Sequence, residues 1–338
     1  MHVLPFPPID RAITKSEWKK QLAEAISSPA ELLRQLDLEH LLKENTDFES
    51  GFRLRVPQAY INKISKGDPK DPLLLQILPT LLENHPSGIL DPVGDLEAMP
   101  SLGLLHKYHG RALIITTAAC AIHCRYCFRR HFPYSDAQAL SSQWSETLAY
   151  LQQHDEIHEV ILSGGDPLML DDDKLSALCR DLENIPHIKW LRLHTRLPVV
   201  LPARITPSLL DWMKSSRFRI TVVIHANHAN ELGNEEFMAI QALKNSNVGL
   251  LNQSVLLKNI NDNAATLVDL SHRLHDAGVT PYYLHLLDQV RGGLHFDVNR
   301  EKASKIVDNM RSQLPGYLVP RLVVEEKGAS SKTAISNI

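Results

Sequence analysis

From residue 111 onward, short runs of apolar and β-branched residues alternate with longer segments in which apolar residues recur at helical spacing. The short runs predict six strands, at 111–117, 159–164, 189–195, 218–226, 248–257 and 280–288. The helical patterns lie near 142–153, 172–183, 207–215, 234–245, 263–277 and 299–313. Strands and helices that alternate in this way are typical of a parallel sheet. The pattern therefore predicts about six βα units, with a last short strand at 317–325.

The N-terminal part of the chain lacks this alternation. An amphipathic pattern at 14–28 predicts a helix, with Thr14 and Glu17 spaced as a capping box. Pro29 is placed to open a second helix, and the segments that follow are rich in Pro, Asp and Gly. We therefore expect three regions: a helical region and connector at 1–105, an α/β region at 106–315, and a C-terminal strand and tail at 316–338.

Polar residues gather at the ends of the predicted strands. Examples are SGGD at 163–166, HTR at 194–196 and HANH at 225–228. In parallel α/β folds, ligands bind at the carboxyl ends of the strands. The pattern predicts an open or partial α/β barrel whose mouth carries the functional site.

Composition narrows the class of protein. The 338 residues carry a formal net charge of −3, so there is no broad basic field for nucleic acid or an anionic membrane. The N-terminus does not resemble a signal peptide, and no apolar run approaches the roughly 18 residues of a spanning helix. We expect a soluble cytoplasmic protein that binds neither nucleic acid nor membrane. Of its four cysteines three are clustered, which indicates metal binding rather than disulfides.

The cluster is Cys120, Cys124 and Cys127, spaced C-x3-C-x2-C. A structural zinc site needs four ligands, and His123 lies in so tight a loop that it would ligate with strain. Cys179 falls in a helical pattern and is interpreted as a core residue, which disfavours a four-cysteine cluster. Three thiolates suit a [4Fe–4S] cluster with one open iron, which could chelate the methionine part of S-adenosylmethionine. A non-enzymatic zinc or iron–sulfur module is the alternative of another class.

The cysteine spacing after the first strand, together with SGGD at the end of the next, resembles radical S-adenosylmethionine enzymes. In that family the edge of the second strand binds the methionine amino group. The resemblance therefore implies S-adenosylmethionine binding by Ser163, Gly164, Gly165 and Asp166. Glycine at such an edge would let a ligand approach the backbone closely.

Longer segments resemble one family within that group, the lysine 2,3-aminomutases. They include CRYCFRRHF, TRLPVVLPARIT, NQSVLLKNIND, PYYLHLLD and GASSKT, and the resemblance runs from about residue 70 to residue 332. It is strongest to the short bacterial branch, which makes β-lysine for modification of elongation factor P. The resemblance implies a partial (βα)6 radical SAM barrel that moves the amino group of L-α-lysine from C2 to C3. The implied cofactors are a [4Fe–4S] cluster, S-adenosylmethionine and pyridoxal 5′-phosphate.

The resemblance also implies residue roles. Lys332 would form the Schiff base with pyridoxal phosphate, and Lys107, Tyr108 and Arg111 would lie at its phosphate. Arg196, His225 and Gln253 match positions near S-adenosylmethionine. Arg129 would hold the substrate carboxylate, which a guanidinium fork matches, while Asp288 and Glu325 would hold the ε-ammonium of lysine.

The chain departs from the larger members of the family at two places. His285 stands where they carry a tyrosine near the cofactor, and there is no cysteine after Cys179, so their zinc-binding extension is not expected. The implied partners are L-lysine, a reductase that supplies one electron, and a lysyl-tRNA-synthetase-like ligase that acts on elongation factor P. The alternative is a free-standing aminomutase for catabolism or osmolyte supply.

Overall fold

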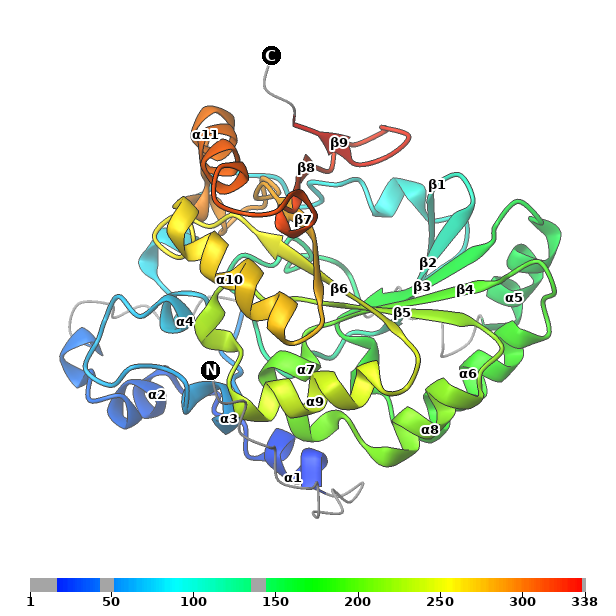
Figure 1. Cartoon of the computed structure of the whole chain (residues 1–338), viewed down its shortest axis with the longest axis horizontal. Coiled ribbons are helices and arrows are strands. Elements are labelled where there is room, and N and C mark those ends of the chain that lie inside the picture. Colours follow the sequence, from blue (N-terminus) through cyan, green and yellow to red (C-terminus); the bar gives the residue numbers. More distant parts are fainter. Residues whose placement is uncertain (1–16, 43–51, 135–143, 336–338) are drawn as a thin grey trace.

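The structure is a computed structural model that describes residues 17–42, 52–134 and 144–335. Its strands form one nine-stranded sheet in chain order (Figure 1). They are β1 (Leu104–Tyr108), β2 (Arg111–Thr117), β3 (Glu159–Gly164), β4 (Trp190–Thr195), β5 (Arg219–Ile224), β6 (Gly249–Val255), β7 (Thr280–His285), β8 (Arg321–Val324) and β9 (Thr333–Ala334). Strands β2 to β8 are parallel, while β1 and β9 pair antiparallel at the two edges.

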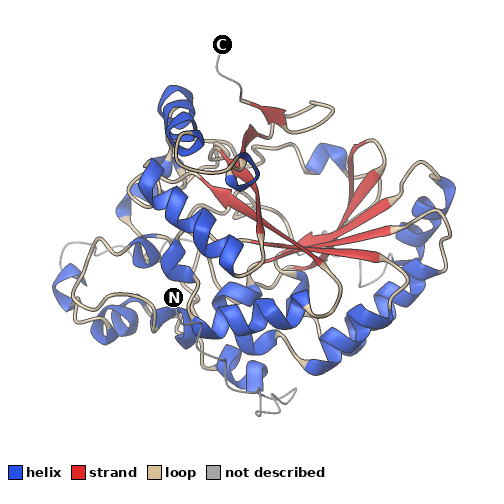
Figure 2. Ribbon diagram, viewed as in Figure 1, coloured by secondary structure: helices blue, strands red, loops and turns tan. Residues whose placement is uncertain are grey.

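Helices connect each parallel strand to the next and cover the outer face of the sheet (Figure 2). They are α5 (Trp144–Gln153), α6 (Asp172–Glu183), α7 (Leu197–Val200), α8 (Pro207–Ser215), α9 (Asn234–Lys244), α10 (Ala264–Asp276) and α11 (Arg300–Arg311). The predicted α/β class and its six βα units are thus confirmed, with β8 as a seventh parallel strand. None of the helices in the described ranges has the length and apolar character needed to cross a membrane.

The sheet curls strongly. In a flat sheet β1 and β8 would lie seven strand spacings apart, or roughly 34 Å at about 4.8 Å each. Yet Lys107 Nζ on β1 lies 3.1 Å from Oε1 of Glu325, which directly follows β8. The curl closes most of a barrel and brings side chains from both edges of the sheet to one mouth.

Two short edge strands were not predicted. Strand β1 was assigned to the irregular connector, because its polar residues Lys107 and Tyr108 hide the alternation typical of a strand. It turns into β2 at Gly110, whose φ of 77° favours glycine. Strand β9 follows Lys332 directly and pairs with β8, which anchors the segment that carries this lysine.

The N-terminal helices pack against the α/β part. They are α1 (Glu17–Ala23), α2 (Pro29–Gln35), α3 (Gln58–Ile61) and α4 (Pro72–Leu75). Pro29 opens α2 as predicted, whereas Thr14 of the predicted capping box lies outside the described residues. Leu32 and Leu33 belong to the same buried apolar cluster as the barrel strands. Lys63 adds a polar tie, since its Nζ bonds the carbonyl of Val199 at 2.7 Å and pairs with Glu236 at 2.6 Å.

The buried acid Glu83 binds two arginines of the cysteine loop. Glu83 receives hydrogen bonds from Nε of Arg125 at 2.8 Å and from Nη2 of Arg130 at 2.6 Å. All three side chains are almost fully buried. Arg125 lies between Cys124 and Tyr126, so this carboxylate fixes the loop between two of its cysteines.

We expect Glu83→Gln to destabilise the fold by about 3–5 kcal/mol, because it removes the buried carboxylate that pairs with two buried guanidinium groups. Urea unfolding followed by circular dichroism measures this. Glu301→Gln is the matched control, since Glu301 pairs with Lys305 on an exposed helix face and should leave the unfolding midpoint unchanged. Equal midpoints for the two variants would show that the buried charge cluster does not stabilise the loop.

Candidate active site

A cavity of about 530 Å³ opens at the carboxyl ends of the parallel strands. Its size is typical of a small-molecule site. It brings together every site residue that the sequence predicts: Cys120, Cys124 and Cys127; Ser163, Gly164, Gly165, Asp166, Arg196, His225 and Gln253; Lys107, Tyr108, Arg111 and Lys332; and Arg129, Asp288 and Glu325.

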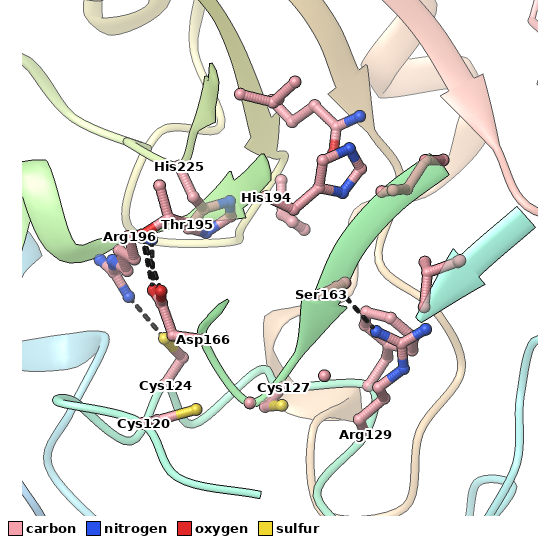
Figure 3. A pocket seen from close by; sticks show the side chains of 18 of the residues that line it. Cys120, Cys124, Cys127, Arg129, Ser163, Asp166, His194, Thr195, Arg196 and His225 are labelled. Atoms are coloured by element: carbon pink, nitrogen blue, oxygen red, sulfur yellow. Dashed lines mark hydrogen bonds between the residues drawn. The ribbon is translucent and has the colours of Figure 1, made fainter. Parts of the chain in front are cut away.

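The cysteine loop follows β2 and places its three thiols at one end of this cavity (Figure 3). Burial and the neighbouring Cys124 raise the pKa of Cys127 to about 11. Within the described residues, no three His, Cys, Asp or Glu side chains converge closely enough to ligate one metal ion. The thiolates of a [4Fe–4S] cluster each bind a different iron, so they do not need to converge on one point.

Two other residues that could ligate a metal, His123 and Cys179, are engaged in other contacts. His123 Nδ1 lies 2.8 Å from the carbonyl oxygen of Arg53, and its ring stacks on Phe52. Its Nδ1 is therefore engaged by the backbone of the N-terminal region, although His123 also lines the cavity. Cys179 is fully buried in the apolar core, as predicted. The three clustered cysteines remain without a fourth protein thiol, which suits a cluster with one open iron.

Arg196 holds one of the three thiols. Its Nη1 donates to Cys124 Sγ at 2.6 Å (Figure 3), and its Nη2 donates to Glu231 at 2.7 Å. Gln76 accepts a second bond from the same Nη2 at 2.8 Å. The structure thus places Arg196 as an anchored donor to a cysteine sulfur. Glu231 and Gln76, which fix it, were not predicted, because nothing in their local sequence marks them.

The SGGD segment packs against the start of the cysteine loop. Gly164 has a φ of 115°, and a Cβ at Gly165 would overlap the carbonyl oxygen of Ala119. Close contact between two backbones therefore requires both glycines.

Asp166 organises the next strand end rather than presenting a free carboxylate. Its oxygens accept hydrogen bonds from Thr195 Oγ1 (2.7 and 2.9 Å) and from the backbone amide of Arg196 at 2.7 Å (Figure 3). The backbone amide of Leu168 adds another at 3.0 Å. Burial raises the pKa of Asp166 to about 6.

A row of alternating charges crosses the cavity wall. Lys332 pairs with Glu325, and Lys107 bridges Glu325 at 3.1 Å and Asp95 at 2.5 Å. Asp95 in turn accepts from Nε of Arg129 at 2.7 Å. Burial alone would raise the pKa of Glu325, but the charges of Lys332 and Lys107 lower it to about 2. Glu325, predicted to hold the substrate ammonium, is here the counter-ion of two lysines.

Asp95 in this row was not predicted. It lies in the connector segment DPVGD, where an acid between glycine and leucine reads as a turn residue. Only the tertiary fold brings it to Arg129 and Lys107.

Asp288 stands apart from the row. Within the described part of the chain, its carboxylate makes no ion pair or hydrogen bond with another side chain. Burial, reinforced by the charge of Glu325, raises the pKa of Asp288 to about 7, although Lys332 and Lys107 oppose the shift. A partly buried acid that pairs with no cation among the described residues is a candidate counter-ion for a ligand ammonium.

Five buried polar atoms of residues that line the cavity lack a partner within the described part of the chain: Nε of Arg130 and Arg196, and Nε2 of His194, Gln253 and His285. Burial lowers the pKa of both histidines well below the usual value, so both are neutral. Buried groups of this kind usually bond to water or to a ligand. His194, which was not among the predicted site residues, lies on β4 with its ring in the pocket (Figure 3). His225, by contrast, bonds the hydroxyl of Tyr126 at 2.8 Å.

The fold and the site define the class. A cysteine triplet after the first parallel strand, at the mouth of a partial barrel, is the arrangement of radical SAM enzymes, and the Radical SAM superfamily model matches residues 114–270. This class carries a [4Fe–4S] cluster and S-adenosylmethionine. The three thiols suit such a cluster, and Arg196 would hold one of them.

Comparison with whole proteins is more specific. The L-lysine 2,3-aminomutase of Escherichia coli (strain K12) is 46% identical over 326 residues, 95% of each chain. That of Clostridium subterminale is 33% identical over 324 residues, 95% of this chain and 78% of the other. The chain therefore belongs to the lysine 2,3-aminomutase family of radical SAM enzymes, which are isomerases. A solved radical SAM methyltransferase from Sphaerobacter thermophilus matches at 12% identity over 65% of this chain and 68% of that one, with a TM-score of 0.47, too low to bear on function.

Proposed function

We propose that the protein converts L-α-lysine to β-lysine by moving the amino group from C2 to C3, with pyridoxal phosphate bound through Lys332. The observation that carries this proposal is the placement of Asp288 and Arg129 in one cavity. The first is an acid that forms no ion pair within the described residues, and the second is a buried guanidinium. Lysine offers the complementary pair, an α-carboxylate and a distant ammonium.

The residues present fit pyridoxal phosphate. Nζ of Lys332 lies in the cavity beside Glu325, on a segment anchored by β9. Lys107 and Arg111 supply cations for a phosphate, and Arg111 packs over the ring of Tyr108, with its guanidinium carbon 4.7 Å from the ring centroid. The unpartnered atoms of His194 and His285 offer hydrogen bonds to polar atoms of a cofactor.

The bound cofactors supply reversible hydrogen-atom abstraction and a conjugated system for the migrating nitrogen. The chain supplies the positions. Arg129 and Asp288 would bind the two ends of lysine and so fix its C2 and C3 between the cysteine loop and Lys332. The curled sheet and the buried walls would exclude water from the reacting atoms.

The same proposal extends to the use of the product. The near-complete mutual coverage with the Escherichia coli enzyme supports a place in the short branch, whose product modifies elongation factor P. A one-electron reductase and a lysyl-tRNA-synthetase-like ligase would be the partners. Mass spectrometry of elongation factor P from cells lacking this chain tests the role: loss of the β-lysyl mass supports it, and retention of that mass contradicts it.

We expect Asp288→Asn to raise the KM for L-lysine roughly a hundredfold or more, because the ε-ammonium would lose the carboxylate proposed to pair with it. The affinity for S-adenosylmethionine should not change. Asp297→Asn is the matched control: Asp297 lies on the same loop but is exposed, and its carboxylate accepts a hydrogen bond from Gln289. An unchanged KM for L-lysine in Asp288→Asn would show that Asp288 does not bind the ε-ammonium of lysine.

The same acid predicts a pH dependence. With a pKa of about 7, Asp288 loses its negative charge as the pH falls through neutrality. The KM of the wild-type protein for lysine should therefore rise as the pH falls from about 8 to 6, and the Asp288→Asn variant should lack this rise. A pH-independent wild-type KM would contradict the role of Asp288.

A further inference from the structure

Asp95 lies between two cations that the proposed function gives to two different ligands. Its Oδ2 accepts from Nε of Arg129 at 2.7 Å, and its Oδ1 pairs with Nζ of Lys107 at 2.5 Å. Asp95 is only 2% exposed, so water hardly screens either contact. One carboxylate thus holds the proposed carboxylate-binding residue and a proposed phosphate-side residue at once.

The position of Asp95 is itself fixed. The Asp91 carboxylate accepts hydrogen bonds from the backbone amides of Asp95, at 2.9 Å, and of Leu96, at 3.0 Å. Lys107 is held further by a bond from its Nζ to the carbonyl of Val93 at 2.8 Å. The acid and one of its two cations therefore belong to a rigid corner between the connector and β1.

These contacts set the orientation of Arg129. Its Nε is taken by Asp95, one hydrogen of Nη1 goes to Ser163 Oγ at 3.2 Å, and its guanidinium packs on the ring of Phe128. A guanidinium has five N–H donors. Within the described residues nothing bonds Nη2, so the end of the group formed by Nη1 and Nη2 keeps donors for a carboxylate.

The charge of Asp95 also separates two anion sites. Without it, Arg129 and Lys107 would be neighbouring cations that one small anion could bridge. The Asp95 carboxylate pairs with both cations and so offsets part of the charge of each, and Lys107 also pairs with Glu325. Burial alone would raise the pKa of Asp95, but the charges of Arg129 and Lys107 lower it, so the acid is ionised at neutral pH.

We propose that Asp95 is a positioning residue that aims Arg129 at the α-carboxylate of the substrate and keeps Lys107 for the phosphate of the cofactor. The inference rests on the proposed function, which assigns these two ligands. Asp95 would act on both ligands through these two cations, so its loss would misplace two cations without removing one.

Ligand binding to the protein saturated with pyridoxal phosphate tests this, with the absorbance of the bound cofactor as the readout. The ligands are L-lysine and cadaverine, which is lysine without its carboxylate. Asp95→Asn should weaken lysine binding roughly tenfold to a hundredfold, the usual loss for a charged hydrogen bond, and leave cadaverine binding little changed. Titration of the cofactor-free variant should also show weaker binding of pyridoxal phosphate.

Glu97→Gln is the control, since Glu97 lies two residues further on, is exposed and pairs with Lys327. Asp95→Glu, which keeps the charge, should recover part of the lysine affinity and serves if Asp95→Asn fails to fold. If Asp95 acts through Arg129, the double variant Asp95→Asn, Arg129→Lys should bind lysine only slightly more weakly than either single variant. Wild-type lysine affinity in Asp95→Asn, or an equal loss for lysine and cadaverine, overturns the inference alone. A wild-type protein that does not bind lysine overturns the proposed function as well.

Discussion

Alanine in place of Cys120, Cys124 or Cys127 should in each case lower turnover by at least about a thousandfold. When several residues act as one unit, loss of any one of them removes most of the activity. The three thiols share one end of the cavity, and no other cysteine of the chain lies there. Iron content after anaerobic reconstitution should fall with the activity.

Cys179→Ala is the matched control for these variants. Cys179 is fully buried on α6, away from the cavity, so its replacement should cost about 1 kcal/mol of stability and leave the iron in place. Equal loss of iron in this variant and in the three loop variants would contradict the cluster assignment. Tightly bound zinc without iron in the wild-type protein would favour the alternative of a non-enzymatic zinc module.

Lys332→Ala should abolish covalent attachment of pyridoxal phosphate and lower turnover by at least about a thousandfold, since the nucleophilic amine is lost. It should also raise the pKa of Glu325, which loses one of its two cations. Borohydride reduction with pyridoxal phosphate, followed by peptide mapping, measures the attachment.

Lys327→Ala is the control for this second prediction. Lys327 lies in the same tail, but its side chain is exposed and pairs with Glu97. The Lys327→Ala variant should be labelled by pyridoxal phosphate at Lys332 and should turn over substrate like the wild type. A reduced label on Lys327, or on any lysine other than Lys332, would contradict the assignment.

Much of the site follows from sequence because it is local. The cysteine spacing, the SGGD segment and the polar strand ends are each encoded in a few neighbouring residues, and a parallel sheet brings strand ends to one edge. The three Cys residues, Asp288 and Lys332 could therefore be assigned to one cavity from pattern and resemblance. The six βα units were predictable for the same reason.

What could not be predicted depends on contacts between distant segments. Asp95 and Glu83 lie in an irregular connector, and only the fold pairs them with arginines of the cysteine loop. The two lysine partners of Glu325 come from β1 and from the tail, which meet because the sheet curls. The glycines of SGGD, which were expected to admit a ligand, line the cavity, and they also let two backbones pack together, a contact that the sequence did not predict.

The most direct test of the central claim is conversion of L-lysine by the anaerobic wild-type protein. The protein is loaded with iron, sulfide and pyridoxal phosphate, then supplied with S-adenosylmethionine and a one-electron reductant. We predict that mass spectrometry after chromatography detects β-lysine, with none in the Cys124→Ala protein and no amino migration in L-glutamate. Fully loaded wild-type protein that leaves L-lysine unchanged, or that converts glutamate equally well, would contradict the account.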